Sequence, residues 1–270
     1  MHTKTLYINL VGRIGNNLFQ IAAAMSLAKR HKAKVVAIPD PYYRLPFPDE
    51  GKSLYDYLKP YQKAFFRNIE ISRNFPDSFV KYDEPSFCYN ELPFADKIYL
   101  FGYFQSEKYF DIPYIRKTFS ISPQNRSSLM DKFGNLLNLN PVSINVRRGD
   151  YLLQTDYHPV CSIEYYQKCI DLIGRERCFI VTSDDVAWCK ENFKGKNFHV
   201  IEEITPLENL YLQSLCHGHI ISNSTFSWWG AWLNPNMGKK VFAPRKWFGK
   251  RLSHHETKDL FPQNWIVVEE

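Results

Sequence analysis

The sequence lacks long apolar runs and cysteine motifs, the features that would indicate a membrane span, a zinc site or a disulfide framework. It has no run of about 18 apolar residues, so no segment is predicted to span a bilayer. None of the six cysteines forms a Cys-x-x-Cys pair or has histidines at zinc-finger spacing, so we expect reduced, buried thiols. Met1 leads within about five residues into a predicted strand, which leaves no room for a signal peptide and predicts a cytoplasmic protein.

The composition that is present is that of a globular protein. The chain has 270 residues, 44% of them hydrophobic and 23% charged, with a net charge of +6. This length allows one large domain or two domains of ordinary size, each with its own core, and we expect two. No internal repeat or low-complexity tract is visible.

The first forty residues have the pattern of a β-α-β unit with a glycine-rich turn. Thr5–Val11 is predicted to be a strand, and the spacing of apolar residues over Asn16–Lys32 predicts a helix that Asn16 would cap. Gly12-Arg13-Ile14-Gly15 separates the two, and a second strand is expected at Lys34–Ile38. The turn lacks the third glycine and the acidic residue of a dinucleotide fingerprint, so close backbone approach to a sugar fits it better than NAD.

The middle of the chain has weaker patterns. Eight prolines alternate with aromatic residues over Pro39–Asp96, where only short elements are expected. A strand is predicted at Lys97–Phe101, followed by a helix through Tyr109 and another from Pro113. The polar stretch Ser120–Arg126 is the predicted domain boundary.

The last half alternates strands and helices at regular spacing. The predicted strands are Val142–Val146, Cys178–Thr182, Phe198–Ile201, His219–Ser222 and Lys239–Ala243. The predicted helices are Ile163–Ile173, Asp185–Phe193, Pro206–Cys216 and Phe226–Leu233. This order predicts a parallel, doubly wound sheet whose ligands bind at the carboxyl ends of its strands.

Two arginines follow the first of these strands, in the segment Ser143–Tyr151. Guanidinium groups bind phosphate in a fork, so a pyrophosphate site is one interpretation, and an Arg-Asp pair that braces the turn is the other. Side chains alternate along a strand, so only one arginine aims easily at a ligand. We expect Arg147 to do so and Arg148 to brace Asp150.

Polar residues also follow two further strands. In Ile220–Trp232, Ser224 and Thr225 stand where a helix N-terminus would present N–H groups to an anion, although a simple helix cap explains the same residues. Three tryptophans, Trp228, Trp229 and Trp232, are expected to pack between helix and sheet. In Thr182–Asp185, a carboxylate could accept hydrogen bonds from guanine or ribose, or cap a helix; the pattern leaves this open.

Four segments taken together resemble glycosyltransferase family 11, the α-1,2-fucosyltransferases. They are Gly12–Gln20, Gly102–Glu107, Asn145–Tyr151 and Asn209–Trp232. The resemblance implies an α/β fold of the GT-B type, with two facing Rossmann-like domains and parallel sheets. It also implies an acceptor-side domain at 1–122, a GDP-fucose-binding domain at 123–270, GDP-β-L-fucose as donor, inversion at the anomeric carbon, and no metal or cofactor.

Individual roles follow from the same resemblance. Arg147 matches the arginine that holds the donor's β-phosphate, and Asp184 or Asp185 matches the acidic residue that reads guanine. Asn16 matches an asparagine beside the sugar and the acceptor. Asn145 stands where the family commonly has histidine, so a histidine-based proton role is excluded there. The remaining expected donor-binding residues are Gly12, Arg13, Gly15, Arg148, Ser224, Thr225 and Phe226.

Inversion in one step requires a base that takes the proton of the acceptor hydroxyl. The candidates, in order, are Asp150, Asp156, His158 and Glu107. With Arg147 for the charge that develops on the leaving group, the expected catalytic residues are Asp150, Arg147, Asn16 and His158.

The expected activity is transfer of fucose to the 2-hydroxyl of a galactose-terminated glycan. A fucosyltransferase of other linkage or acceptor, such as a core-glycan or protein O-fucosyltransferase, is an alternative, as is a sugar-nucleotide-binding module without turnover.

The basic segment 239–251 is either a solvated face or a peripheral contact with the inner face of a membrane, and we expect no nucleic-acid partner. The oligomeric state has no signature in the sequence. The basic residues of this segment are Lys239, Lys240, Arg245, Lys246, Lys250 and Arg251, interleaved with Phe242, Trp247 and Phe248.

Overall fold

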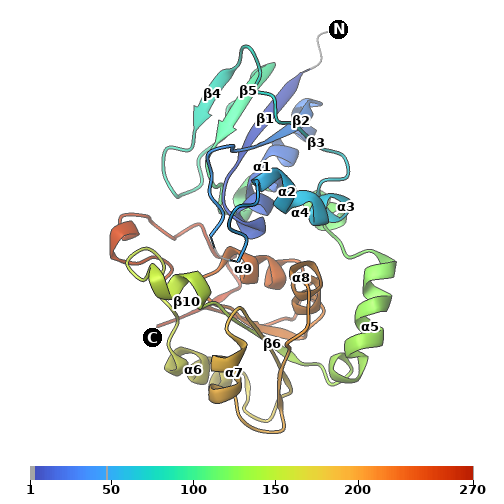
Figure 1. Ribbon diagram of the computed structural model, residues 1–270, viewed down its shortest axis with the longest axis vertical. Helices are drawn as coiled ribbons and strands as arrows, with labels where there is room; N and C mark the ends of the chain where they lie inside the picture. Colours follow the sequence, from blue (N-terminus) through green and yellow to red (C-terminus); the bar gives the residue numbers. More distant parts are fainter. Residues whose placement is uncertain (1–3, 47, 270) are drawn as a thin grey trace. The chain divides into compact units, whose positions relative to one another are not determined.

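The computed structural model describes residues 4–46 and 48–269, and the chain divides into two compact units (Figure 1). The first unit comprises residues 1–120 and 255–262, and the second comprises residues 121–254 and 263–270. The division falls after Ser120, at the start of the predicted boundary Ser120–Arg126 and two residues before the expected domain end at 122. The pattern also gives no sign that residues 255–262 return to the first unit.

The first unit is built on a five-stranded parallel sheet in the order β3-β2-β1-β5-β4. The central strand β1 pairs with β2 on one side, with Leu10 opposite Pro39, and with β5 on the other. Loops that leave the carboxyl ends of β1, β2 and β5 therefore start side by side. The strands are β1 (Thr5–Leu10), β2 (Lys34–Pro39), β3 (Glu70–Ile71), β4 (Val80–Asp83) and β5 (Lys97–Phe101).

Helix α1 connects β1 to β2 and corrects one expectation. It runs over Ile14–His31 with Arg13 at the N-cap, so Asn16 lies inside the first turn and does not cap the helix. The N–H of Ile14, at the first position of the helix, instead donates to the hydroxyl of Tyr57, at 3.2 Å. The remaining helical elements of this unit are α2 (Leu54–Leu58), η1 (Lys59–Tyr61), α3 (Gln62–Phe65), η2 (Glu107–Tyr109) and α4 (Ile112–Thr118).

The proline-rich middle region contains only short elements, as expected. The pattern missed β3 and β4, which flank the sheet, because they have two and four residues and largely exposed side chains. β3 is too short to show a pattern, and the alternation in β4 spans only four residues, so both strands are recognised from their pairing with β2 and β5.

The second unit is a six-stranded parallel sheet in the order β11-β10-β9-β6-β7-β8. The chain starts in the middle at β6, builds outward through β7 and β8, and then returns to the other side of β6. This doubly wound order confirms the prediction and creates a switch point between β6 and β9. The strands are β6 (Val142–Val146), β7 (Phe179–Ser183), β8 (Phe198–Val200), β9 (Gly218–Ile220), β10 (Val241–Pro244) and β11 (Ile266–Val268).

Helices cover both faces of this sheet. Figure 1 shows α6 and α7 on one side and α8 and α9 on the other, as right-handed crossovers in opposite directions require. The helices are α5 (Pro123–Leu137), η3 (Gly149–Leu153), α6 (Ile163–Ile173), α7 (Val186–Asn192), α8 (Pro206–Ser214), α9 (Thr225–Trp232) and η4 (Lys250–Leu252).

The core of the second unit confirms two further expectations. The three tryptophans of α9 are at most 1% exposed and contact one another, so they pack in the interior. All six cysteines are free, although Cys88 and Cys178 are only half-buried. Within residues 4–46 and 48–269, no helix has both the length and the apolar character needed to cross a membrane.

Candidate functional site

The switch point of the second unit brings together three of the predicted polar segments. The loops after β6, β7 and β9 leave neighbouring strands at the carboxyl edge of the sheet. In doubly wound sheets, this edge is where ligands bind. The loops carry Arg147 and Arg148, Asp184 and Asp185, and Ser224 with Thr225.

Arg147 is held by two carboxylates at this edge. Its Nη1 donates to Asp184 at 2.5 Å, its Nη2 donates to Asp150, and its guanidinium lies 4.9 Å from the centre of the Tyr151 ring. Burial alone would lower the pKa of Arg147, but the charges of Asp184 and Asp150, together with Tyr151, outweigh it and raise that pKa. Arg147 therefore stays a cation, with 17% of its side chain exposed.

The sequence pattern predicted that Arg148 would brace Asp150, and this prediction is wrong. Arg147 contacts Asp150 instead. The Nε of Arg148 donates to Asp185 at 3.0 Å, and its guanidinium lies over the ring of Trp188 at 4.4 Å. Arg148 is instead held by Asp185, the N-cap residue of α7, while Asp150 binds Arg147.

The two aspartates after β7 have different tasks. Asp185 accepts the N–H of Trp188 at 3.1 Å and thereby caps α7, which fulfils the capping interpretation. Asp184 faces the β6 loop, where it accepts from Arg147 and from the backbone N–H of Arg148 at 2.8 Å.

Gly149 and Asn145 shape the same loop. A Cβ added to Gly149 would lie 2.4 Å from a carboxylate oxygen of Asp184, so only glycine allows this approach. Asn145 is 5% exposed and donates to the hydroxyl of Thr182 at 2.9 Å. It therefore ties β6 to β7.

The loop after β9 completes the edge. Ser224 caps α9 and accepts the N–H of Phe226 at 3.3 Å, as the capping interpretation predicts, and Thr225 and Phe226 are half-buried. Asn223, which the sequence analysis did not single out, accepts from the hydroxyl of Tyr151 at 3.4 Å and donates to the carbonyl of Pro159 at 2.7 Å. These bonds fix the β9 loop against the β6 loop.

Two of the four candidate bases lie near Arg147. The ring of His158 stacks on Tyr151 with centres 4.8 Å apart, and burial lowers the pKa of His158, while the charge of Asp150 opposes this shift. Burial raises the pKa of Tyr151 to about 12, so it stays protonated at neutral pH. Asp150 has 14% of its side chain exposed and contacts Arg147 directly.

The other two candidate bases lie elsewhere. Asp156 is exposed, and its backbone carbonyl accepts the N–H of Arg251 at 2.9 Å. Glu107 belongs to the first unit, where its charge interacts with Arg116. Glu107 thus lies in a different unit from Arg147, and among the described residues no hydrogen bond or ion pair joins Asp156 to Arg147.

In the first unit, two separately predicted motifs meet at the switch point between β1 and β5. Gly12 has a φ of +84°, and a Cβ there would lie 2.3 Å from the side-chain nitrogen of Asn16. Asn16 accepts from Gln105 at 3.2 Å, and Gln20 donates to the carbonyl of Gly102 at 3.0 Å. The Gly12 turn and the Gly102 loop therefore form one amide-lined edge.

Arg13 and Gly15 have local structural roles in this unit. The guanidinium of Arg13 donates to the carbonyl of Pro46 at 2.8 Å and lies 3.7 Å from Asp49, so it anchors the loop after β2. Gly15 is buried in the first turn of α1. Donor contact by either residue stays a prediction.

Glu84 is a residue that the sequence analysis missed. Its carboxylate accepts the backbone N–H of Tyr103 at 2.7 Å and of Phe104 at 3.0 Å. Phe104 has a φ of +52°, a strained value that this contact holds in place. Burial raises the pKa of Glu84, against the effect of these hydrogen bonds. Glu84 thus positions the loop that carries Gln105, although its place in the irregular region gave no signal.

The basic segment 239–251 differs from its prediction. Lys239 is 8% exposed and donates to the carbonyl of Asn234 at 2.9 Å, so it belongs to the interior. Phe242 and Trp247 are also buried, so these aromatic side chains are not presented to a membrane. Arg245 forms an ion pair with Glu269 at 2.9 Å. Membrane contact through the remaining exposed cations stays a prediction.

In the part of the chain that the structure describes, no group of three or more His, Cys, Asp and Glu side chains is arranged to hold a metal ion. Metal independence stays a prediction.

Two Rossmann-like units, each with a parallel sheet and polar loops at its switch point, place the chain in the GT-B fold class, as expected. The solved structures it resembles include the α-1,6-fucosyltransferase NodZ from Bradyrhizobium, soaked with GDP-fucose. That match has a TM-score of 0.53 at 14% identity and covers 86% of this chain and 93% of NodZ. A glycosyl transferase family 9 protein from Veillonella parvula matches with a TM-score of 0.57 at 9% identity, covering 100% and 88%.

The family itself follows from the sequence match. The model of glycosyl transferase family 11 matches residues 2–269, and the chain belongs to that family. The O-antigen biosynthesis glycosyltransferase WbnK of Escherichia coli is 29% identical, over 97% of this chain and 99% of WbnK. An α-1,2-colitosyltransferase of Escherichia coli is 33% identical over 62% and 61% of the two chains. The human galactoside α-(1,2)-fucosyltransferase 1 is 25% identical over 86% of this chain and 65% of the human protein.

Proposed function

We propose that this glycosyltransferase transfers L-fucose from GDP-β-L-fucose to the 2-hydroxyl of a terminal galactose, with inversion and without a metal. The observation that carries the proposal is the family match over residues 2–269 together with Arg147 at the switch point of the second unit. Relatives named for α-1,2 transfer support the linkage. The NodZ structure soaked with GDP-fucose supports a nucleotide-sugar donor.

The second unit would bind the GDP part of the donor. The carboxyl edge of its sheet offers the guanidinium of Arg147 and the N-terminus of α9, whose first N–H groups attract an anion. Arg148, at the same edge, is already paired with Asp185. Asp184 lies at the same edge and would accept hydrogen bonds from guanine or ribose. As the bond between fucose and GDP breaks, Arg147 would stabilise the charge that grows on the β-phosphate.

The carboxylates beside Arg147 set a condition on this mechanism. Arg147, Asp150 and Asp184 together carry one net negative charge when all are ionised, which would repel a diphosphate. A diphosphate therefore binds well only if it takes over N–H groups of Arg147 that one carboxylate now holds. Asp150 is the group we propose to be released, since it then becomes available as the base.

The base takes the proton of the acceptor hydroxyl as the new bond forms. Asp150 is proposed for this role, and His158, whose lowered pKa keeps it neutral at neutral pH, is the second candidate. The first unit would contribute Asn16, which its contact with Gln105 orients, to hold the fucose and the accepting hydroxyl. An amide suits this task because it donates and accepts without carrying charge.

One finding favours a second donor. The relative named as an α-1,2-colitosyltransferase has a higher identity, 33%, than the human fucosyltransferase, over a shorter match. Colitose is fucose without its 3-hydroxyl, so the two donors differ by one polar group. A site that hydrogen-bonds that hydroxyl would reject colitose strongly, whereas an apolar site would not discriminate.

The test is a transfer assay with chelator present. GDP-fucose and GDP-colitose are each incubated with lactose, N-acetyllactosamine and a galactose-free disaccharide in EDTA, and the product linkage is determined by NMR. We expect an α-1,2 fucosyl linkage on galactose alone. A colitosyl product only, another linkage, or activity that appears only when Mg²⁺ or Mn²⁺ is restored would each contradict a named part of the proposal. Binding of GDP-fucose without any turnover would favour a non-catalytic module.

A further inference from the structure

A pocket of about 390 Å³ opens in the first unit beside the end of β2. Its floor is Pro39, whose strand partner is Leu10, two residues before Gly12. The loop that borders it is anchored to the Gly12 turn through Arg13 and the carbonyl of Pro46. The pocket therefore lies next to the turn that the proposed function assigns to the sugar and the acceptor.

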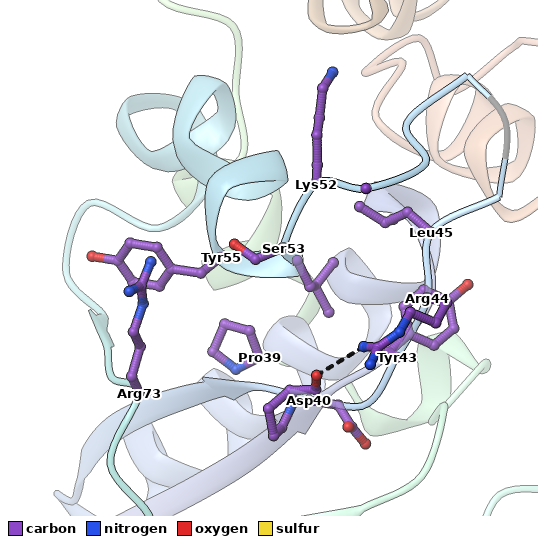
Figure 2. A pocket seen from close by; sticks show the side chains of 12 residues that line it. Pro39, Asp40, Tyr43, Arg44, Leu45, Lys52, Ser53, Tyr55 and Arg73 are labelled. Atoms are coloured by element: carbon purple, nitrogen blue, oxygen red, sulfur yellow. Dashed lines mark hydrogen bonds between the residues drawn. The ribbon is translucent and has the colours of Figure 1, made fainter.

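The lining of the pocket combines ring faces with positive charge. Arg44, Lys52 and Arg73 line it, against the single carboxylate of Asp40. Figure 2 shows Tyr55 and Arg73 on one side, Arg44 on the other, and Pro39 between them. Tyrosine faces pack against the C–H surface of a pyranose ring while their hydroxyls remain wet.

Among residues 4–46 and 48–269, neither Arg44 nor Arg73 forms a close ion pair with a carboxylate. The guanidinium of Arg73 stacks over Tyr55 at 4.3 Å and makes only a long ion contact, 4.0 Å, with Asp56. Arg44 donates to the carbonyl of Pro41 at 3.1 Å, which is uncharged. Lys52, in contrast, is paired with Asp49 at 3.0 Å. Arg44 and Arg73 therefore retain charge that a ligand can meet.

We infer that this pocket is an acceptor subsite for a sugar residue that carries an anionic group, a carboxylate or a phosphate, next to the accepting galactose. A planar guanidinium binds either anion through two parallel N–H groups, which a neutral sugar cannot use fully. The inference rests on the proposed function, because it takes galactose to be the accepting sugar.

The experiment compares three acceptors that share a terminal β-1,4-linked galactose. They are N-acetyllactosamine, its 1-phosphate, and galactosyl-β-1,4-glucuronic acid, so that a neutral sugar, a phosphate and a carboxylate are tested separately. The variants are Arg44→Gln/Arg73→Gln, Arg73→Lys, and the control Arg67→Gln, which removes an exposed arginine of the same unit outside the pocket.

We expect at least one anionic acceptor to have a KM about tenfold below that of N-acetyllactosamine. The double variant should abolish this preference, while its kcat with the neutral acceptor stays within about twofold of wild type. Arg73→Lys should keep part of the preference, Arg67→Gln should keep all of it, and raised salt should reduce it. Whether phosphate or carboxylate gives the lower KM identifies the anion.

Direct titration separates failure of the subsite from failure of the proposed function. The same acceptors are titrated into GDP-bound enzyme. Transfer with equal KM values for all three acceptors, or a preference that survives in the double variant, overturns the subsite and leaves the function standing. Anion-dependent binding that needs Arg44 and Arg73, without transfer to any galactoside, supports the subsite and contradicts the function.

Discussion

Both units are parallel sheets with a switch point beside their first strand, but they differ in the chemistry at those switch points. In the second unit, the loops at the carboxyl edge carry ion pairs, with Arg147 between Asp150 and Asp184. In the first unit, glycines and amides predominate at the matching edge, where Asn16 is bonded to Gln105, and the charged Arg13 and Glu84 hold the adjoining loops. A parallel sheet thus supplies a place for a ligand, and the side chains at the strand ends decide which ligand it is.

This difference fits the division of labour that we propose. A diphosphate requires fixed positive charge, and that charge needs nearby carboxylates to stay in place before the ligand arrives. A sugar hydroxyl requires groups that both donate and accept, and a fixed charge beside it would cost desolvation without a partner. Variants at the two edges should therefore affect nucleotide binding and acceptor binding differently.

The largest expected effect comes from Arg147→Ala. Loss of the only cation proposed for the β-phosphate should lower kcat/KM about 1,000-fold and weaken GDP binding, because no other charge replaces it. Steady-state kinetics and calorimetric titration of GDP measure both quantities. Arg175→Ala, at an exposed ion pair on the surface of the same unit, is the control and should behave like wild type. GDP affinity that is unchanged in Arg147→Ala would show that the phosphate contact is assigned to the wrong residue.

The variant Asp150→Asn tests whether Asp150 acts as the catalytic base or only holds Arg147 in position. If Asp150 takes the proton, kcat should fall about 100-fold while GDP binds as well as before or more tightly, since one negative charge near the diphosphate is gone. If Asp150 only holds Arg147, GDP affinity and kcat should fall together. The same titrations, run on this variant, decide between the two.

The variant Asn16→Ala should weaken the use of the acceptor and leave GDP binding unchanged. We expect the KM for the acceptor to rise about tenfold, through the loss of one oriented amide, while GDP affinity stays at its wild-type value. A loss of GDP affinity in this variant would mean that the first unit also contacts the nucleotide, and the proposed contrast would fail.

The smallest effect concerns stability rather than binding. His219 is buried, bonds to Asn234 through Nε2 at 2.8 Å, and has a pKa that burial, together with Lys239, lowers to about 3. A lowered pKa means that His219 is neutral when folded, so its contribution to stability is present above pH 6.5 and is lost as the pH falls toward 3. Urea unfolding from pH 6.5 down to about 5 should show a slope up to about 1.4 kcal/mol per pH unit steeper than in His219→Gln. Equal slopes would contradict the assignment, and GDP affinity should be unaffected.

Much of the second unit could be predicted because its apolar strands alternate with helices at regular spacing. Val142–Val146 is buried throughout, and the polar residues that end it stand out against that background. The doubly wound order, the packing of the tryptophans and the meeting of the β6, β7 and β9 loops all followed from this periodicity. The side-chain pairs within the site could not be predicted from the sequence. A pair such as Arg147 with Asp150 depends on side-chain rotamers, which residue spacing does not determine.

The first unit was less predictable because its contacts join distant residues. The N–H of Ile14 meets Tyr57, 43 positions away, and Glu84 reaches Phe104 across 20 positions. Tyr57 and Glu84 lie in the proline-rich region, where the elements are too short to show a periodic pattern of apolar residues. The N-cap of α1 was misplaced for the same reason, since a distant hydroxyl took the role that a local side chain was expected to fill.

Hydrogen–deuterium exchange with GDP and then with GDP-fucose tests the central contrast most directly. We predict that GDP alone protects peptides covering residues 145–151 and 222–227 of the second unit, and that GDP-fucose adds protection at the Gly12 turn. Protection of the Gly12 turn by GDP, with residues 145–151 exchanging as in the free protein, would contradict the assignment of the nucleotide to the charged edge.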